Sequence, residues 1–197
     1  NRIRMSLVQD VFNLGSASYQ VPGGTSWTDP VVNPVPITVQ KAIELPYYFN
    51  TDQNLASYMV CAQRPNSGCV TFEVWEKLSS ATDFVYRDTC QTYTPSGVLA
   101  SPYQSKQDVD SVGFTIVGNV DINSLSGSSD TDIRNGANLA VFESGEFFAF
   151  SGFTDNLNGT ITLTGIWGGL FDTVPSYHAA GERIWFFSYG ASNPEDK

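Results

Sequence analysis

Apolar and polar residues alternate along much of this chain, which is the pattern of half-buried β-strands. In CVTFEVWEKL, residues 69–78, Val70, Phe72 and Val74 fall on one face, and the intervening side chains, Trp75 among them, fall on the other. Other segments are rich in β-branched and aromatic residues, which fit a pleated surface, and they predict further strands. These segments are 1–8, 36–45, 57–63, 82–90, 112–120, 137–144, 145–153, 160–167 and 183–189.

Two short sequences predict tight turns between neighbouring strands. FESGEF, residues 142–147, is typical of a hairpin, and Asn158-Gly159 is a strong hairpin signal because both residues accept positive φ. No segment keeps a helical period of 3.6, and only residues 51–59 and 128–138 favour a turn or two of helix. We therefore predict an all-β fold, an antiparallel β-barrel or sandwich with long loops and little helix.

Two of the predicted strands are apolar on both faces. Phe147, Phe148 and Phe150 cannot all point into one core from one strand, and the same holds for residues 184–187. Some of these side chains must lie under a loop, a second sheet or a partner chain. A homodimer that buries one face of the sheet would account for them.

The connections between the predicted strands are uneven in length. A chain of 197 residues is most simply a single domain, here residues 1–197, with the last few polar residues as a linker. Long irregular segments on a compact β scaffold usually carry function. The long connections of this chain are residues 15–36, 91–108, 123–138 and 172–182.

The charge balance restricts the class of partner. Twenty acidic residues oppose ten basic ones, and the resulting net charge of −10 repels phosphate backbones and anionic lipid. We therefore expect neither a nucleic acid nor a membrane as partner.

The start of the chain lacks a signal-peptide pattern, and we expect the chain to be a piece excised from a longer precursor. Only 15% of residues are charged, which favours an extracellular or virion-surface module.

The three cysteines leave two interpretations open. Cys61 and Cys69 stand at the two rims of a predicted turn, and a disulfide between them is possible if they face each other. Alternatively, all three cysteines, Cys61, Cys69 and Cys90, are small buried thiols. A zinc site is disfavoured, because seven residues separate Cys61 from Cys69 and the single histidine, His178, is far along the chain. We expect no metal and no cofactor.

The residue patterns do not favour an enzyme. A Ser-His-Asp triad would have to use His178, but no G-x-S-x-G motif precedes it, and SYHAAG predicts a surface loop. The acidic clusters at residues 108–110 and 130–132 lie in predicted loops, where solvated carboxylates are common. In DTDIRNG, residues 130–136, Arg134 occupies a position at which a calcium loop needs an oxygen ligand.

Aromatic residues in the loops are the best candidates for a binding site. Trp27, Tyr103 and Tyr177 lie in Gly-, Pro- and Ser-rich connections, and His178 adjoins Tyr177. Aromatic faces stack on sugars and anchor protein interfaces, so we predict these four residues as receptor or glycan contacts. The alternative is that each one closes an end of the barrel. Trp75 on its strand is a second candidate.

In outline the chain resembles a viral capsid protruding domain, and most closely an astrovirus capsid spike. The resemblance rests on the start at NRIRMSLV, the strand-and-loop body, and the exit from RIWFFSYG into acidic SNPEDK. It implies a β-barrel spike, usually a homodimer, on the surface of a virion whose capsid protein is made in the host cytoplasm. It also implies attachment to a host-cell receptor and recognition by neutralising antibodies.

A second function remains open at this point. A carbohydrate-binding module or lectin-like domain of a secreted or phage tail protein would also combine a rigid β scaffold with aromatic loops. In either case we expect contact with a protein or glycan receptor rather than catalysis.

Overall fold

A computed structural model describes residues 33–46, 57–118 and 125–187. The predicted strand at residues 1–8, the candidate Trp27 and the predicted linker lie outside these ranges. No helix in the described ranges is long and apolar enough to cross a membrane.

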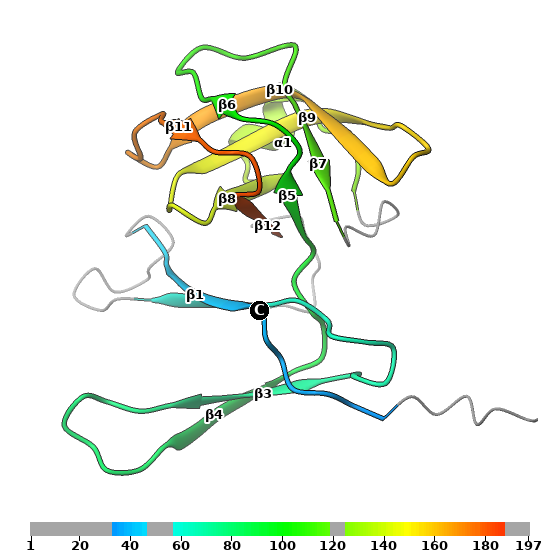
Figure 1. Ribbon diagram of the computed structural model, residues 1–197. Helices are drawn as coiled ribbons and strands as arrows, with labels where there is room; N and C mark the ends of the chain where they lie inside the picture. Colours follow the sequence, from blue (N-terminus) through cyan, green and yellow to red (C-terminus); the bar gives the residue numbers. More distant parts are fainter. Residues whose placement is uncertain (1–32, 47–56, 119–124, 188–197) are drawn as a thin grey trace, which may run out of the picture. The chain divides into compact units, whose positions relative to one another are not determined.

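Six antiparallel strands close into a barrel (Figure 1). The strand order around the barrel is β10-β7-β5-β12-β8-β9, and every neighbouring pair is antiparallel. The predicted all-β antiparallel fold is confirmed, in its barrel form. The strands are β5 (Ser96–Leu99), β7 (Phe114–Val117), β8 (Leu139–Phe142), β9 (Phe147–Asp155), β10 (Thr160–Leu170) and β12 (Arg183–Phe187).

Strand alternation fills the barrel interior with large apolar side chains. Phe148 and Phe150 of β9 point inward, as do Ile184 and Phe186 of β12. They meet Phe142 of β8, whose ring centroid lies 4.6 Å from that of Phe148. The barrel therefore has a packed core rather than an open channel.

The outward-facing apolar residues of β9 and β12 are covered by the same chain. Strands β1 (Gln40–Glu44) and β2 (Tyr58–Ala62) pair antiparallel, and their Ile43 and Cys61 pack against Phe147 and Trp185 of the barrel. The sequence predicted that a loop, a second sheet or a partner chain covers these residues. The structure shows a second, two-stranded sheet. Burial of these two strands thus does not require a partner chain.

A short helix, α1 (Asp130–Arg134), covers another part of the outer face. Ser129 caps it, since its hydroxyl accepts from the Asp132 amide while the Asp132 carboxylate accepts from the Ser129 backbone. The hydrogen bond from the Ser129 side chain lowers the pKa of Asp132. Ile133 packs in a cluster with Leu139 and Ala149. In DTDIRNG the acidic residues therefore begin a helix, which was one of the predicted outcomes.

A second hairpin is formed by β3 (Phe72–Glu76) and β4 (Val85–Cys90), as the alternation predicted (Figure 1). A register shift between Val74 and Trp75 brings Trp75 opposite Tyr86. Their rings meet edge to face at 5.6 Å, and both remain about half exposed. This hairpin thus leaves aromatic surface open on one face.

Both predicted tight turns are present. Phe142 donates its amide proton to the Glu146 carbonyl across the β8–β9 turn, where Gly145 has φ 102°. In the β9–β10 turn Gly159 has φ 83°, a conformation that suits glycine and disfavours residues with a Cβ atom.

The prediction of irregular structure was wrong for parts of two segments. Residues 91–108 contain β5 and β6 (Tyr103–Gln104), and residues 172–182 contain β11 (Tyr177–His178). These strands have two to four residues, too few for an alternation pattern to be recognised. Their conformation is set by partners distant in sequence, since β5 pairs with β12 and β7, and β6 pairs with β11.

Candidate functional site

The structure separates the candidate residues that the sequence placed together. Tyr177 and His178 are neighbours on β11, so their side chains point to opposite sides. Tyr177 is 64% exposed, whereas His178 is completely buried. Tyr103, opposite His178 on β6, is also buried, in the main core cluster. Of the four candidates, Tyr177 alone is shown at the surface, and Trp27 lies outside the described residues.

His178 lies inside the protein between two carboxylates. Its ring stacks on Phe142 at a centroid distance of 3.6 Å. Nε2 is 2.9 Å from Oε2 of Glu146, and Nδ1 is 3.1 Å from Oε2 of Glu182. The prediction of a surface-loop histidine was wrong, because pairing between β11 and β6 turns this side chain inward.

Glu146, the deeper of the two carboxylates, is saturated with hydrogen bonds. It accepts from the Ser105 hydroxyl, from the Gly169 amide at 3.2 Å, and from the amide and hydroxyl of Ser176 at 2.8 and 3.0 Å. Burial by itself would raise the pKa of Glu146, but the hydrogen bonds from His178 and Ser105 lower it. Glu146 is therefore a stable buried anion.

The same contacts determine the charge of His178. Burial acts to lower its pKa, but Glu146 and Glu182 together raise it above the usual value. The protonated ring donates from both nitrogens to carboxylates, while the Ser144 and Ser176 hydroxyls lie farther away, at 3.4 Å each. A ring in this state has no lone pair with which to take a proton from a hydroxyl. We call Glu146, His178 and Glu182 the His178 cluster; its geometry is that of a buried ion pair.

No metal site emerges from the described ranges. They contain no group of three or more His, Cys, Asp or Glu side chains placed to hold a metal ion. The two carboxylates of the His178 cluster each contact a different nitrogen of one ring, so the ring stands where an ion would have to bind.

The cysteines are free thiols in this structure. Cys61 faces the outer surface of the barrel, where burial raises its pKa to about 12. Cys69 is directed elsewhere, with its Sγ 3.5 Å from the Val35 carbonyl oxygen. Cys90 is also unbonded. Of the two interpretations of the sequence, the structure has the separate thiols and lacks the Cys61–Cys69 bond.

A surface cavity lies between the β2–β3 and β4–β5 connections. Its volume is about 650 Å³, within the range of roughly 300–1,000 Å³ that is typical of small-ligand sites. We call it the Arg64–Tyr93 groove. Residues 63–67 and 91–95 line it together with Val70. Arg64 is the single charged residue among the described residues that line it, so these residues supply one cation and no carboxylate in an otherwise acidic chain.

Hydrogen bonds fix the two principal side chains of the groove. Arg64 donates from Nε to the Cys69 carbonyl at 2.7 Å and from Nη2 to the Ser67 carbonyl at 2.9 Å. The Tyr93 hydroxyl donates to the Thr71 carbonyl at 3.1 Å, and its ring lies 5.1 Å from that of Phe72. Side chains held in this way lose little further entropy when a ligand binds.

The groove is also tied to the barrel. Arg183 of β12 donates from Nη1 to Oε1 of Gln63 at 3.0 Å, and the Thr94 amide donates to the Ala62 carbonyl at 2.9 Å. Since β12 is a barrel strand, a rigid element supports one edge of the groove.

Sequence reasoning did not single out the groove residues. Tyr93 and Tyr103 share the segment 91–108, and the segment alone did not distinguish the surface tyrosine from the buried one. Arg64 lies in QRPNSG, which was considered as a turn and not as a binding element. A usable signal was present, because Arg64 is one of only ten basic residues in the chain and stands in a polar turn.

Comparisons with protein-family models, with curated protein sequences and with solved structures found no match to this chain.

Proposed function

We propose that the chain is a viral capsid spike domain, of the astrovirus type that it resembles, which attaches to a host-cell receptor. The Arg64–Tyr93 groove is the observation that carries this proposal. It combines a fixed aromatic ring, one cation and several amides on a barrel scaffold. Rigid scaffolds with irregular binding segments are typical of recognition modules.

The interior of the barrel supports a role in binding. The His178 cluster satisfies its own charges with internal hydrogen bonds and presents no free base to a substrate. A packed core with a hydrogen-bonded charge cluster gives the scaffold stiffness, which an attachment domain needs. Loops around the groove and exposed residues such as Tyr177 would also form antibody epitopes.

The test is binding of the fluorescently labelled native chain to susceptible cells. We expect Tyr93→Ala and Arg64→Ala each to weaken binding by about tenfold or more. Tyrosine and arginine anchors commonly cost more than about 1 kcal/mol, and tenfold is about 1.4 kcal/mol. Tyr58→Ala and Arg87→Ala are matched controls, because both residues are exposed and neither lines the groove.

Tyr177→Ala provides a further arm of the same experiment. It tests the exposed candidate that the sequence suggested against the groove that the structure suggests. Loss of binding in Tyr177→Ala with full binding in Tyr93→Ala would contradict the groove as the receptor site.

The second candidate function is a carbohydrate-binding module. The observation that favours it is that Tyr93 lines the groove together with the amide-bearing residues Gln63 and Gln91, since sugars stack on aromatic rings and bond to amides. Competition by free monosaccharides in the cell-binding assay distinguishes the two. Full inhibition of cell binding by one free sugar indicates glycan recognition. Binding that no free sugar inhibits, but that is lost after protease treatment of the cells, indicates a protein receptor.

We also propose that the domain is a homodimer, as spikes of this type are. The β3–β4 hairpin is the surface best suited to this role. Trp75, Phe84 and Tyr86 are 52%, 63% and 46% exposed on it. Two-stranded hairpins are marginally stable by themselves, so further contacts would stabilise this one.

A further inference from the structure

The chain contains two Asn-Gly pairs, Asn135-Gly136 and Asn158-Gly159, and the structure places them in different backbone environments. A glycine after an asparagine offers an unhindered amide nitrogen, because it has no Cβ atom. That nitrogen can attack the side-chain carbonyl carbon of the asparagine, which starts the loss of ammonia known as deamidation. In a folded protein the outcome depends on the hydrogen bonds that hold the two groups.

The Asn158-Gly159 pair lies in the turn between β9 and β10, which projects from the barrel (Figure 1). Both residues are exposed, and Gly159 has φ 83°. Among the described residues, none accepts a hydrogen bond from the Gly159 amide. The attacking nitrogen therefore has no hydrogen bond to break before it approaches the side chain of Asn158.

The side-chain carbonyl of Asn158 is polarised by Thr160. Its Oδ1 accepts from the Thr160 amide at 3.1 Å and from the Thr160 hydroxyl at 2.7 Å. Negative charge develops on a carbonyl oxygen when a nucleophile adds to its carbon, and donors aimed at that oxygen stabilise the charge. The folded turn thus supplies two donors at the place where charge develops.

The Asn135-Gly136 pair ends α1 and is held differently. The Gly136 amide donates to the Ile133 carbonyl at 2.9 Å, and the Asn135 amide donates to the Asp132 carbonyl at 3.0 Å. Attack by the Gly136 nitrogen would break its hydrogen bond and open the end of the helix. Asn135 is exposed, as Asn158 is, so exposure does not distinguish the two pairs.

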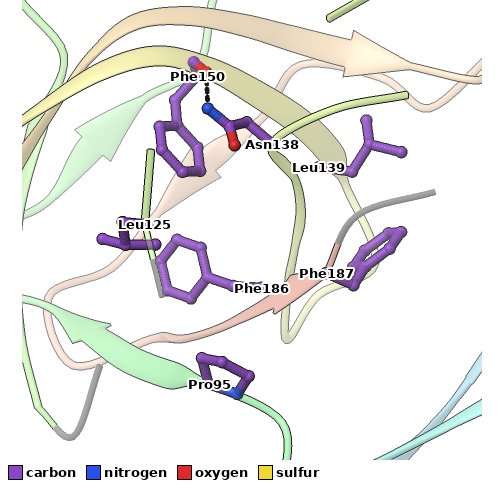
Figure 2. Close-up of a pocket in the computed structure, with 7 residues that line it drawn as sticks. All are labelled: Pro95, Leu125, Asn138, Leu139, Phe150, Phe186 and Phe187. Carbon is purple, nitrogen blue, oxygen red and sulfur yellow. Dashed lines mark hydrogen bonds between the residues drawn. The ribbon is translucent and has the colours of Figure 1, made fainter. Parts of the chain in front are cut away.

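Asn138 represents a third, buried case (Figure 2). Its side chain is 7% exposed, and Nδ2 donates to the Ser126 carbonyl at 2.6 Å and to the Phe150 carbonyl at 3.2 Å. Nδ2 is the atom that would leave as ammonia, and the next residue, Leu139, has a Cβ atom and belongs to β8. Deamidation is therefore disfavoured at Asn138.

We propose that Asn158 is a site of spontaneous deamidation, in which the Gly159 nitrogen attacks Cγ of Asn158 while Thr160 stabilises the charge on Oδ1. The bond from nitrogen to Cγ forms, the bond from Cγ to Nδ2 breaks, and Nδ2 leaves as ammonia with the proton from Gly159. Water then opens the cyclic imide. Attack of water at Cγ gives aspartate, and attack at the backbone carbonyl carbon gives isoaspartate.

Either product places a new carboxylate in an exposed turn, and isoaspartate also lengthens the backbone there by a methylene. The protein thus acquires a second charge form as it ages, without an enzyme. Neither Asn158 nor Gly159 lines the Arg64–Tyr93 groove, so this inference does not depend on the receptor role of the groove.

The test follows both Asn-Gly pairs in the same native chain. The chain is incubated in mildly alkaline buffer, cleaved after glutamate and analysed by mass spectrometry; Glu143 and Glu146 lie between the pairs and separate them into different peptides. We expect Asn158 to deamidate roughly tenfold faster than Asn135, because a hydrogen bond that must break slows a reaction by up to about that factor. Equal rates would overturn the proposal.

Unfolding the chain in urea tests whether the fold causes the difference. Urea removes the hydrogen bond of Gly136, so we expect deamidation of Asn135 to accelerate and approach that of Asn158. A difference between the two pairs that is unchanged in urea would assign it to the neighbouring sequence and overturn the role of the turn.

A threonine variant tests the stabilisation of Oδ1. We expect Thr160→Val, which removes the hydroxyl donor, to slow deamidation of Asn158 by about three- to tenfold, the range that one hydrogen bond supplies. Thr154→Val is the matched control and should leave the rate unchanged, because Thr154 is exposed on β9 and does not contact Oδ1 of Asn158 through a hydrogen bond. An unchanged or faster rate in Thr160→Val would overturn the part assigned to Thr160.

Discussion

The barrel and the β3–β4 hairpin are built from the same kinds of residue and use them in opposite ways. In the barrel, β9 and β12 are apolar on both faces. Their inner faces pack in the barrel core, and their outer faces are covered by β1, β2 and α1 of the same chain. In the hairpin, Trp75 and Tyr86 pack on each other and remain about half exposed.

Charged groups follow the same division. The barrel buries Glu146 and His178 with complete hydrogen bonding, whereas the hairpin pairs Arg87 with Glu76 in solvent. An exposed ion pair contributes about 0–1 kcal/mol to the free energy of unfolding. Removing one partner of a buried pair lowers that free energy by about 3–5 kcal/mol. The difference indicates that the barrel is a self-sufficient scaffold and that the hairpin has surface left over for contact.

The largest expected effect tests the scaffold. Replacing the buried carboxylate in Glu146→Ala leaves the His178 charge without its closest partner. It also frees four donors, which are the Ser105 hydroxyl, the Gly169 amide, and the amide and hydroxyl of Ser176. We expect the free energy of unfolding to fall by about 3–5 kcal/mol, measured by urea denaturation.

Asp108→Ala is the matched control, because this carboxylate is exposed, and we expect a change within about 0.5 kcal/mol. A loss below about 1 kcal/mol in Glu146→Ala would mean that the cluster does not support the barrel.

The next effect is the dependence of stability on pH. The pKa of His178 is raised above its usual 6.5, so its contribution is complete below about pH 6.5 and is lost as pH rises through the folded value. The pKa of Glu146 is lowered from 4.5, so its contribution is present above pH 4.5 and is lost as pH falls below it.

Together these shifts place maximal stability between about pH 4.5 and 6.5, with a decline on the alkaline side. Urea midpoints measured from pH 4 to 9 test this. The decline above pH 6.5 should disappear in His178→Gln, and its persistence in that variant would assign the titration to another group.

The smallest expected effect on folding comes from the hairpin. We expect the double variant Trp75→Ser, Phe84→Ser to change the free energy of unfolding of the monomeric chain by less than about 0.5 kcal/mol per site, because about half or more of each side chain is exposed. The same variant should convert the native dimer to a monomer, as measured by light scattering at micromolar concentration.

Val174→Ser, at an exposed valine away from the hairpin, is the control and should remain dimeric. A native chain that is monomeric, or a double variant that still dimerises, would show that the exposed hairpin aromatics serve another purpose.

The candidate residues show where sequence reasoning stopped. Composition of the loops selected Tyr103, Tyr177 and His178 together, but pairing between β6 and β11 turns two of them inward and one outward. A two-residue strand has no alternation pattern of its own, so this orientation could not be predicted. The Arg64–Tyr93 groove was missed for a related reason, since its two sides are 21 residues apart in the chain at their nearest members, Val70 and Gln91.

The sequence by itself determined the all-β class, most of the long strands, the two glycine turns and the net negative charge. Each of these follows from local alternation, from the conformational range of glycine, or from the charge count, and none depends on distant residues. Tertiary structure alone decided that the strands close into a barrel, that β1 and β2 cover Phe147 and Trp185, and that His178 meets Glu146. These outcomes depend on contacts between segments far apart in sequence, which the local pattern does not encode.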